Sequence, residues 1–210
     1  MGEEGGGLLA ATTLAEAVGL IPTTGQRQIV GVAGEPGAGK STIAALLVAA
    51  LGPTAALLPM DGYHLPQAEL VELGRRDRMG AADTFDVDAF VATLRDLRSG
   101  RATYAPDFDR TIEEPVQGAL AFPPELRTIV VEGNYLLHDA GGWERVLPLL
   151  DLSFFVEVEP GIRQSRLIER HVRFGKTPEA ARAWALGPDE HNARVVRASA
   201  HGADHVIALR

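Results

Sequence analysis

The sequence contains no cysteine, only two lysines and no surplus of positive charge. The lack of cysteine excludes disulfides and thiolate metal sites and leads us to expect a reducing, cytoplasmic location. With 28 acidic against 20 basic residues the net charge is −8, whereas a chain that binds nucleic acid normally carries a basic surplus. We therefore expect no nucleic-acid partner, and any bound anion must be held by a few placed groups.

Long apolar runs and an early basic segment are also absent. No uncharged apolar run approaches the roughly 18 residues that a membrane-spanning helix needs. No basic residue precedes Arg27, whereas a secretory signal starts with positive charge. We expect a soluble protein without a membrane partner. A length of 210 residues with 46 % hydrophobic and 6 % aromatic content fits one globular α/β domain.

Short apolar runs alternate with helical patterns along the chain. The runs expected to form buried parallel strands are Ile29–Ala33, Ala55–Pro59, Thr128–Val131, Leu152–Val158 and His205–Leu209. Helices are predicted at Leu8–Leu20, Ser41–Leu51, Val87–Leu97 (capped by Asp86), Ile162–Val172, Pro178–Trp184 and Asp189–Ser199. This alternation predicts an α/β three-layer sandwich around a mainly parallel five-stranded sheet. Residues 1–7 are expected to be a disordered tail, and the long connection from Gly62 to Phe122 to hold binding elements.

The segment from Gly34 to Ser41, GEPGAGKS, matches the P-loop pattern G-x-x-x-x-G-K-[ST] between a predicted strand and a predicted helix. Its glycines let backbone N–H groups converge on an anion, and the helix adds its unpaired amides and positive dipole end. Lys40 can then reach the β- and γ-phosphates of a nucleotide, and the Ser41 hydroxyl can bind Mg²⁺. The expected nucleotide-binding residues are Gly34, Glu35, Pro36, Gly37, Ala38, Gly39, Lys40, Ser41 and Thr42.

A P-loop indicates phosphate handling and leaves the reaction open. The guanine-binding motif N-K-x-D of GTPases is absent, because the second lysine, Lys176, is followed by Thr177 and Pro178. The central strand ends at Glu132-Gly133, whereas mechanical ATPases usually have Asp or Asp-Glu there. These features favour a small-molecule kinase. A nucleotide-dependent switch or an assembly ATPase without a small-molecule acceptor stays the alternative.

Seven segments follow one another between Ile29 and Leu209: GEPGAGKST, PMDGYHL, GAADTFD, YAPDFDR, VVEGNYLL, RQSRLIERHVRFGK and ADHVIAL. In this order they resemble the P-loop kinases that group uridine kinase, phosphoribulokinase and type I bacterial pantothenate kinase. The chain is most similar to the nucleoside/nucleotide kinase or fructose-transport-system kinase subgroup. The resemblance implies a single kinase domain over residues 1–210 that uses ATP and Mg²⁺. It also implies a nucleoside, sugar or pantothenate-like acceptor with a hydroxyl group, and it leaves a homodimer open.

The resemblance also implies roles for individual residues. Asp61 corresponds to the base that accepts the substrate hydroxyl proton, and Glu132 to the residue that holds Mg²⁺ directly or through water. Asp83 corresponds to an aspartate that holds sugar hydroxyls, because a carboxylate accepts hydrogen bonds from neighbouring hydroxyls. The other residues expected on the acceptor side are Tyr63, His64, Tyr104, Phe108, Arg110, Asn134 and Tyr135.

Arg110 departs from the pattern of the relatives that act on pyrimidine nucleosides, which have an aromatic residue after the aspartate. An arginine after Asp109 indicates an acidic or polar acceptor, or a charge pair with Asp109 itself. Either interpretation argues against a plain uridine kinase.

Four arginines follow one another at steps of three and four residues: Arg163, Arg166, Arg170 and Arg173. In the resembled kinases, arginines of a helical lid, here at about residues 160–178, stabilise charge on the transferring phosphoryl group. Arg166 and Arg170 are in the best register for this role. The alternative is a solvated helix face with Glu169 as ion-pair partner. His171 is expected to be structural.

Overall fold

The computed structural model describes residues 12–22 and 25–209. The tail expected at residues 1–7 and the first part of the helix expected at Leu8–Leu20 lie outside the described residues. The structure confirms an α/β fold with a parallel sheet of strand order β2-β5-β1-β6-β7. In that order the strands are Ala55–Pro59, Thr128–Gly133, Gln28–Gly34, Leu152–Val158 and His205–Leu209. Each begins and ends within two residues of its predicted range, because buried parallel strands form continuous apolar runs.

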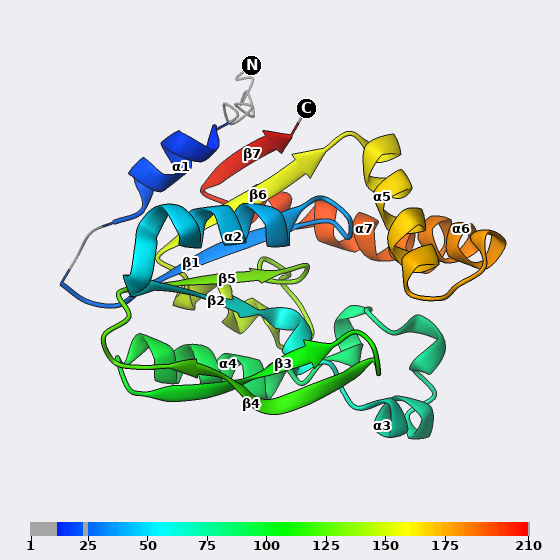
Figure 1. Ribbon diagram of the computed structural model, residues 1–210, viewed down its shortest axis with the longest axis horizontal. Helices are drawn as coiled ribbons and strands as arrows, with labels where there is room; N and C mark the ends of the chain where they lie inside the picture. The colour runs from blue at the N-terminus through cyan, green and yellow to red at the C-terminus, as the bar shows by residue number, and fades with distance from the viewer. Residues whose placement is uncertain (1–11, 23–24, 210) are drawn as a thin grey trace, which may run out of the picture.

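Helices cover both faces of this sheet (Figure 1). Side chains alternate along β1, so Val30 and Val32 pack on one face while Ile29 and Ala33 pack on the other. The first face is covered by α1 (Leu14–Leu20) and α2 (Lys40–Leu51), and the second by α4 (Val87–Arg98) and α7 (Pro188–Ala198). The structure therefore has the three layers that the sequence predicts.

The strands of the sheet end on the side where α5, α6 and α7 gather (Figure 1). The remaining helices around this edge are α3 (Gln67–Glu72), α5 (Pro160–Arg173) and α6 (Pro178–Leu186). Among residues 12–22 and 25–209, none of the helices combines the length and apolar character needed to cross a bilayer. In open parallel sheets the carboxyl ends of the strands form the ligand-binding edge, so this side is where a site is expected.

An antiparallel hairpin, absent from the sequence-based prediction, lies beside α4. Its strands are β3 (Thr103–Asp109) and β4 (Glu114–Phe122), which pair separately from the main sheet. Proline occurs in both strands, at Pro106 and Pro115, and the register shifts between Ala105 and Asp107. Proline within an alternating segment argues against a strand, so the hairpin could not be recognised from the periodicity of its apolar residues. Its turn nevertheless carries Arg110 to the ligand-binding edge.

An aromatic cluster packs around Trp143 in the core. The indole is fully buried, its Nε1 donates a hydrogen bond of 3.0 Å to the carbonyl oxygen of Ala82, and its ring contacts three other aromatic rings. These rings belong to Phe85, Phe90 and Tyr135, at centroid distances of 5.8, 5.7 and 5.6 Å. Such packing is dense and leaves no room to collapse when a large ring is removed.

Trp143→Ala is therefore expected to lower the free energy of unfolding by about 3–5 kcal/mol, as measured by urea denaturation. Val71→Ala on α3 serves as the control, because its side chain is 65 % exposed and its loss should change stability by less than about 0.5 kcal/mol. Equal losses in the two variants would show that the aromatic cluster does not stabilise the fold.

Candidate active site

The loop between β1 and α2 has the backbone geometry of an anion cradle. Gly37 and Gly39 have φ of +80° and +101°, a region that L residues rarely adopt. A Cβ at Gly37 would also lie 2.9 Å from the carbonyl oxygen of Arg163. Within the described part of the chain, no side chain caps α2 at its start, so its first backbone N–H groups remain available to an anion.

Lys40, the first residue of α2, is buried at this loop. Its Nζ donates a hydrogen bond of 3.0 Å to the carbonyl oxygen of Glu35. Burial lowers the pKa of Lys40 to about 8, and the nearby carboxylate of Glu132 only partly opposes this shift. A buried cation without a full counter-charge favours the arrival of an anion, and a nucleotide polyphosphate would supply one.

Nucleotide affinity is accordingly expected to fall as the pH rises through about 8. A bound polyphosphate stabilises the protonated lysine, so binding takes up a proton wherever free Lys40 is already neutral. Below pH 8 the lysine is charged and affinity is full; above it, affinity should fall by up to about tenfold per pH unit. Calorimetric titrations with ATP–Mg²⁺ in two buffers of different ionisation enthalpy measure this proton uptake. A Lys40→Met variant should show no uptake, and a pH-independent affinity in the wild type would contradict the assignment.

Two side-chain oxygens that could bind a metal lie next to each other beside Lys40. The Ser41 hydroxyl donates a hydrogen bond of 3.0 Å to Oε1 of Glu132, the second-last residue of β5, which is buried. Burial raises the pKa of Glu132, and the nearby negative charge of Asp61 adds to the effect. A buried carboxylate next to a hydroxyl fits Mg²⁺, which takes one or two protein oxygens together with phosphate oxygens and water. Ser41 and Glu132 are thus the pair that would hold the metal.

Asp61 follows β2 in a short turn, Met60–Tyr63, and comes close to Glu132 because β2 and β5 are neighbours in the sheet. Its Oδ2 lies 2.5 Å from Nη2 of Arg110 on the hairpin. Burial would raise the pKa of Asp61, but its interactions with His64 and with the cation of Arg110 lower the pKa below its ordinary value. Asp61 is therefore ionised at neutral pH, as a proton acceptor has to be.

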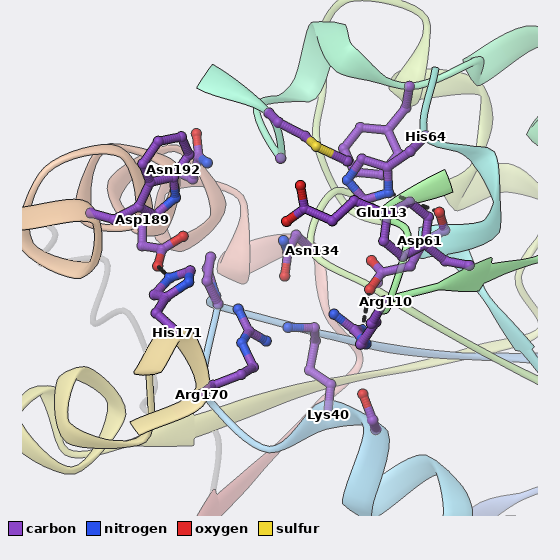
Figure 2. A pocket seen from close by; sticks show the side chains of 18 of the residues that line it. Lys40, Asp61, His64, Arg110, Glu113, Asn134, Arg170, His171, Asp189 and Asn192 are labelled. Atoms are coloured by element: carbon purple, nitrogen blue, oxygen red, sulfur yellow. Dashed lines mark hydrogen bonds and ion pairs between the residues drawn. The ribbon is translucent and has the colours of Figure 1, made fainter. Parts of the chain in front are cut away.

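Figure 2 shows how these groups lie in one pocket, with Lys40 and Arg170 on one side and Asp61, Arg110 and His64 on another. The predicted site residues that line it are Pro36, Lys40, Ser41, Asp61, His64, Phe108, Arg110, Glu132, Asn134 and Arg170. They come from the ends of β1, β2 and β5, from the hairpin and from α5. Residues that are distant in the sequence thus meet at the edge of the sheet.

Other residues predicted for the acceptor side lie elsewhere. Tyr63 and Tyr135 are buried, with 3 % and 1 % of their surface exposed, and the Tyr135 hydroxyl donates to the carbonyl oxygen of Gly80. Tyr104 is 73 % exposed on the hairpin. These tyrosines are absent from the lining of the described pocket. Their rings pack into the core or face solvent, so the structure gives them no contact with the groups around Lys40.

Asp83 is also turned away from the pocket. Its carboxylate forms ion pairs with Arg78 at 2.5 Å and with Arg75 at 3.5 Å, both on the segment that precedes it. The interpretation of Arg110 as a partner of Asp109 is contradicted as well, because Asp109 accepts hydrogen bonds from Thr111, and Arg110 pairs with Asp61. Both aspartates therefore bind partners in their own part of the chain.

The four arginines of α5 have different environments. Arg170 reaches into the pocket, and burial lowers its pKa. Arg166 donates a hydrogen bond of 3.4 Å to the carbonyl oxygen of Ala38 in the P-loop. Arg163 is fully buried and pairs with Glu35 of the P-loop at 2.8 Å and with Glu190 of α7. Arg166 and Arg173 are both exposed, so these two positions match the solvated-face alternative.

Sequence reasoning missed several residues that line the pocket: Arg76, Met79, Gly80, Phe85, Glu113, Gly133, Lys176, Trp184, Asp189 and Asn192. His171, expected to be structural, also lines it, and its Nε2 lies 2.7 Å from Oδ2 of Asp189. Nζ of Lys176 lies 4.5 Å from the centre of the Trp184 ring. A signal for Lys176 was present in the sequence, since the chain has only two lysines and both line this pocket.

Comparison with known proteins places this geometry in context. A chain from Silicibacter sp. TM1040, named a candidate fructose transport system kinase, superposes with a TM-score of 0.83 at 35 % identity, covering 95 % of this chain and 100 % of that one. A candidate uridine kinase of Schizosaccharomyces pombe is 34 % identical over 161 residues, which are 71 % of this chain and 68 % of the relative.

A pantothenate kinase of Enterococcus faecalis is 30 % identical over 149 residues, which are 68 % of this chain but only 48 % of that enzyme. The three relatives carry different names, and two of them name different compounds, uridine and pantothenate, so the likeness extends to the kinase scaffold and not to one acceptor. The model of the phosphoribulokinase / uridine kinase family matches residues 29–185. The chain belongs to this family of P-loop kinases.

Proposed function

We propose that the protein transfers the γ-phosphoryl group of ATP, with Mg²⁺, to a hydroxyl of a small metabolite. One observation carries this proposal. Lys40, the Ser41–Glu132 pair and Asp61 open into the same pocket, with the phosphate-binding groups and the ionised carboxylate on different strand ends. Phosphoryl transfer needs a phosphate cradle and, in line with it, a group that takes the proton of the attacking hydroxyl.

The residues divide the work by position. The P-loop amides and Lys40 would bind the β- and γ-phosphates, while Ser41 and Glu132 would hold Mg²⁺, which neutralises charge on the phosphate oxygens. Asp61 would accept the proton of the acceptor hydroxyl as that oxygen attacks the γ-phosphorus. Arg170 lies across the pocket from Asp61 and would stabilise the charge that builds up on the transferred group (Figure 2).

We place a lid at about residues 160–178, as the resemblance to P-loop kinases implies. Arg163 ties the first half of α5 to the P-loop through Glu35, so this half is fixed to the phosphate site. Gly175, with φ of +95°, follows the end of α5 and precedes α6 at Pro178. We therefore place the moving part of the lid after Arg170, where closure over the pocket would exclude water.

A nucleotide-dependent switch without a metabolite acceptor is the alternative. A switch needs the phosphate site and a mobile segment, but it does not need side chains that bind a phosphate acceptor. Here the pocket extends beyond the phosphate-binding groups to His64, Phe108, Arg110 and Asn134. The three relatives reported above are all named as kinases, two of them for a small molecule, and this supports the same choice.

The experiment that tests the proposal is an ADP-release screen. Purified protein with ATP and Mg²⁺ is offered nucleosides, sugars, hydroxy acids and sugar phosphates, and each hit is checked by mass spectrometry for a gain of one phosphoryl group. We expect one chemical class to raise ADP release far above the acceptor-free rate. Hydrolysis that ignores every metabolite and responds to a protein partner would favour the switch.

A further inference from the structure

Arg110 is paired with the residue that we propose as the base. Its guanidinium contacts Oδ2 of Asp61 at 2.5 Å, and Asp61 is the group that has to receive a hydroxyl proton. A guanidinium held on this oxygen makes the carboxylate a weaker acceptor for a hydroxyl proton, because the charge-assisted hydrogen bond stabilises its ionised form. The side chain of Arg110 is 44 % exposed, whereas that of Asp61 is 25 % exposed, so the arginine is the freer partner. Asp61 therefore becomes a stronger proton acceptor once Arg110 moves away.

Within the described part of the pocket, the other carboxylates are already engaged. Glu113 pairs with Arg76 at 2.6 Å, and Asp189 lies 2.7 Å from His171. Glu132 accepts from Ser41 and is the proposed metal ligand. Outside the pocket, Asp109 is held by its own turn through Thr111. A displaced Arg110 would thus have to share a carboxylate that already has a partner.

The surrounding charge makes an unpaired Arg110 unfavourable. Lys40 and Arg170 share the pocket, and each is a cation whose pKa burial lowers. Lys176 lines the same pocket with a ring face as its contact, and no carboxylate lies within ion-pair distance of it among the described residues. A guanidinium released among these cations calls for an anion from outside the chain.

From this arrangement we infer that the acceptor carries an anionic group, a carboxylate or a phosphate ester, which takes Arg110 away from Asp61. The inference rests on the proposed function and deepens it, because it names the class of the acceptor. Arg110 then has two partners in turn: Asp61 in the free protein and the acceptor anion in the complex. A neutral polyol or water offers Arg110 no negative charge in place of that of Asp61.

The same exchange protects ATP. With Arg110 in place, water bound near the γ-phosphate meets a weakened base, so hydrolysis without an acceptor is slow. If Asp61 is released, water attacks the γ-phosphorus, the bond to the ADP oxygen breaks, and the water proton passes to Asp61. ADP and inorganic phosphate are the products. Arg110 therefore couples removal of the block to the presence of the correct substrate.

Acceptor-free ATP hydrolysis tests this inference without knowledge of the acceptor. If the open state is a minor conformer populated at about 0.1–10 %, Arg110→Gln should raise the hydrolysis rate by about tenfold or more. The double variant Arg110→Gln/Asp61→Asn should lose that increase. Arg145→Gln is the matched control, because Arg145 pairs with Asp88 at 2.7 Å outside the pocket, and its rate should equal the wild-type rate.

A second arm tests the anion itself. Sodium acetate and methyl phosphate are added to the wild type at constant ionic strength against sodium chloride. Saturable stimulation of hydrolysis by acetate indicates a carboxylate acceptor, and stimulation by methyl phosphate indicates a phosphorylated one. The Arg110→Gln variant should respond to neither anion.

The opposite results would overturn the inference. If Arg110→Gln hydrolyses ATP no faster than the wild type, Arg110 does not block Asp61; a slower rate would mean that Arg110 serves the phosphoryl group instead. If neither anion stimulates the wild type, the anionic acceptor is wrong. The proposed function fails separately, since it requires Lys40-dependent binding of ATP–Mg²⁺ whatever Arg110 does.

Discussion

Asp61→Asn is expected to lower acceptor phosphorylation by about 10²–10⁴-fold, the range typical of a general base, while ATP–Mg²⁺ affinity stays close to that of the wild type. Asparagine keeps the shape of the side chain but cannot take a proton. Asp61 lies in the turn Met60–Tyr63 after β2 and is not part of the P-loop, so its replacement should spare the nucleotide cradle. The rate is measured by ADP release with the acceptor found in the screen, and affinity by calorimetry.

Asp86→Asn provides the control for this change. Asp86 caps α4 by accepting a hydrogen bond from the backbone N–H of Ala89, and asparagine caps a helix equally well. Asp86 is outside the pocket around Lys40, so this variant should keep the wild-type rate. Full turnover by Asp61→Asn with the same acceptor would show that another group takes the proton.

Lys40→Met is expected to give the second large effect, a loss of phosphoryl transfer of about 10²–10³-fold together with weaker ATP–Mg²⁺ binding. Methionine retains the apolar part of the side chain and removes the charge that would meet the β- and γ-phosphates. The loss should appear with every acceptor. It should also appear in acceptor-free ATP hydrolysis, where the double variant Lys40→Met/Arg110→Gln should be slower than Arg110→Gln alone.

The stability of Lys40→Met separates a binding defect from a folding defect. The pKa of Lys40 in the folded protein, about 8, lies below the value of 10.5 for a free lysine. The charged lysine therefore opposes folding at neutral pH, and this cost disappears as the pH rises from about 8 through 10.5. Without nucleotide, the variant should melt no lower than the wild type, and it should lose the upward shift of Tm that ATP–Mg²⁺ produces. A lower melting temperature without nucleotide would indicate a structural role instead.

The sheet and the P-loop could be predicted from sequence because their signals are local. Each core strand is a continuous apolar run, and the motif at Gly34–Ser41 directly follows the first of them. The hairpin was missed for the opposite reason, since Pro106 and Pro115 and the shift of register hide its alternation. Its turn brings Arg110 next to Asp61 across 49 residues of sequence, a contact that no local pattern records.

The acceptor side shows the limit of residue type as a guide. Tyr63 and Tyr135 have the chemistry to contact a substrate, but tertiary packing buries both rings around Phe90 and Trp143. Asp83 has a suitable carboxylate, yet a turn of its own segment directs it to Arg78. The side chains of α5 diverge likewise, because helical spacing places Arg163 and Arg170 near one face but cannot tell which reaches the P-loop and which the pocket.

Every role assigned to the pocket requires that the loop around Lys40 binds the polyphosphate of a nucleotide. The most direct measurement is a calorimetric titration of the wild-type protein with ATP–Mg²⁺ and, separately, with AMP–Mg²⁺. We predict that ATP binds at least about 100-fold more tightly than AMP, a difference of about 2.7 kcal/mol, because only ATP has phosphates that reach Lys40 and the amides of α2. Equal affinities for the two nucleotides, or no heat with ATP, would contradict the central claim.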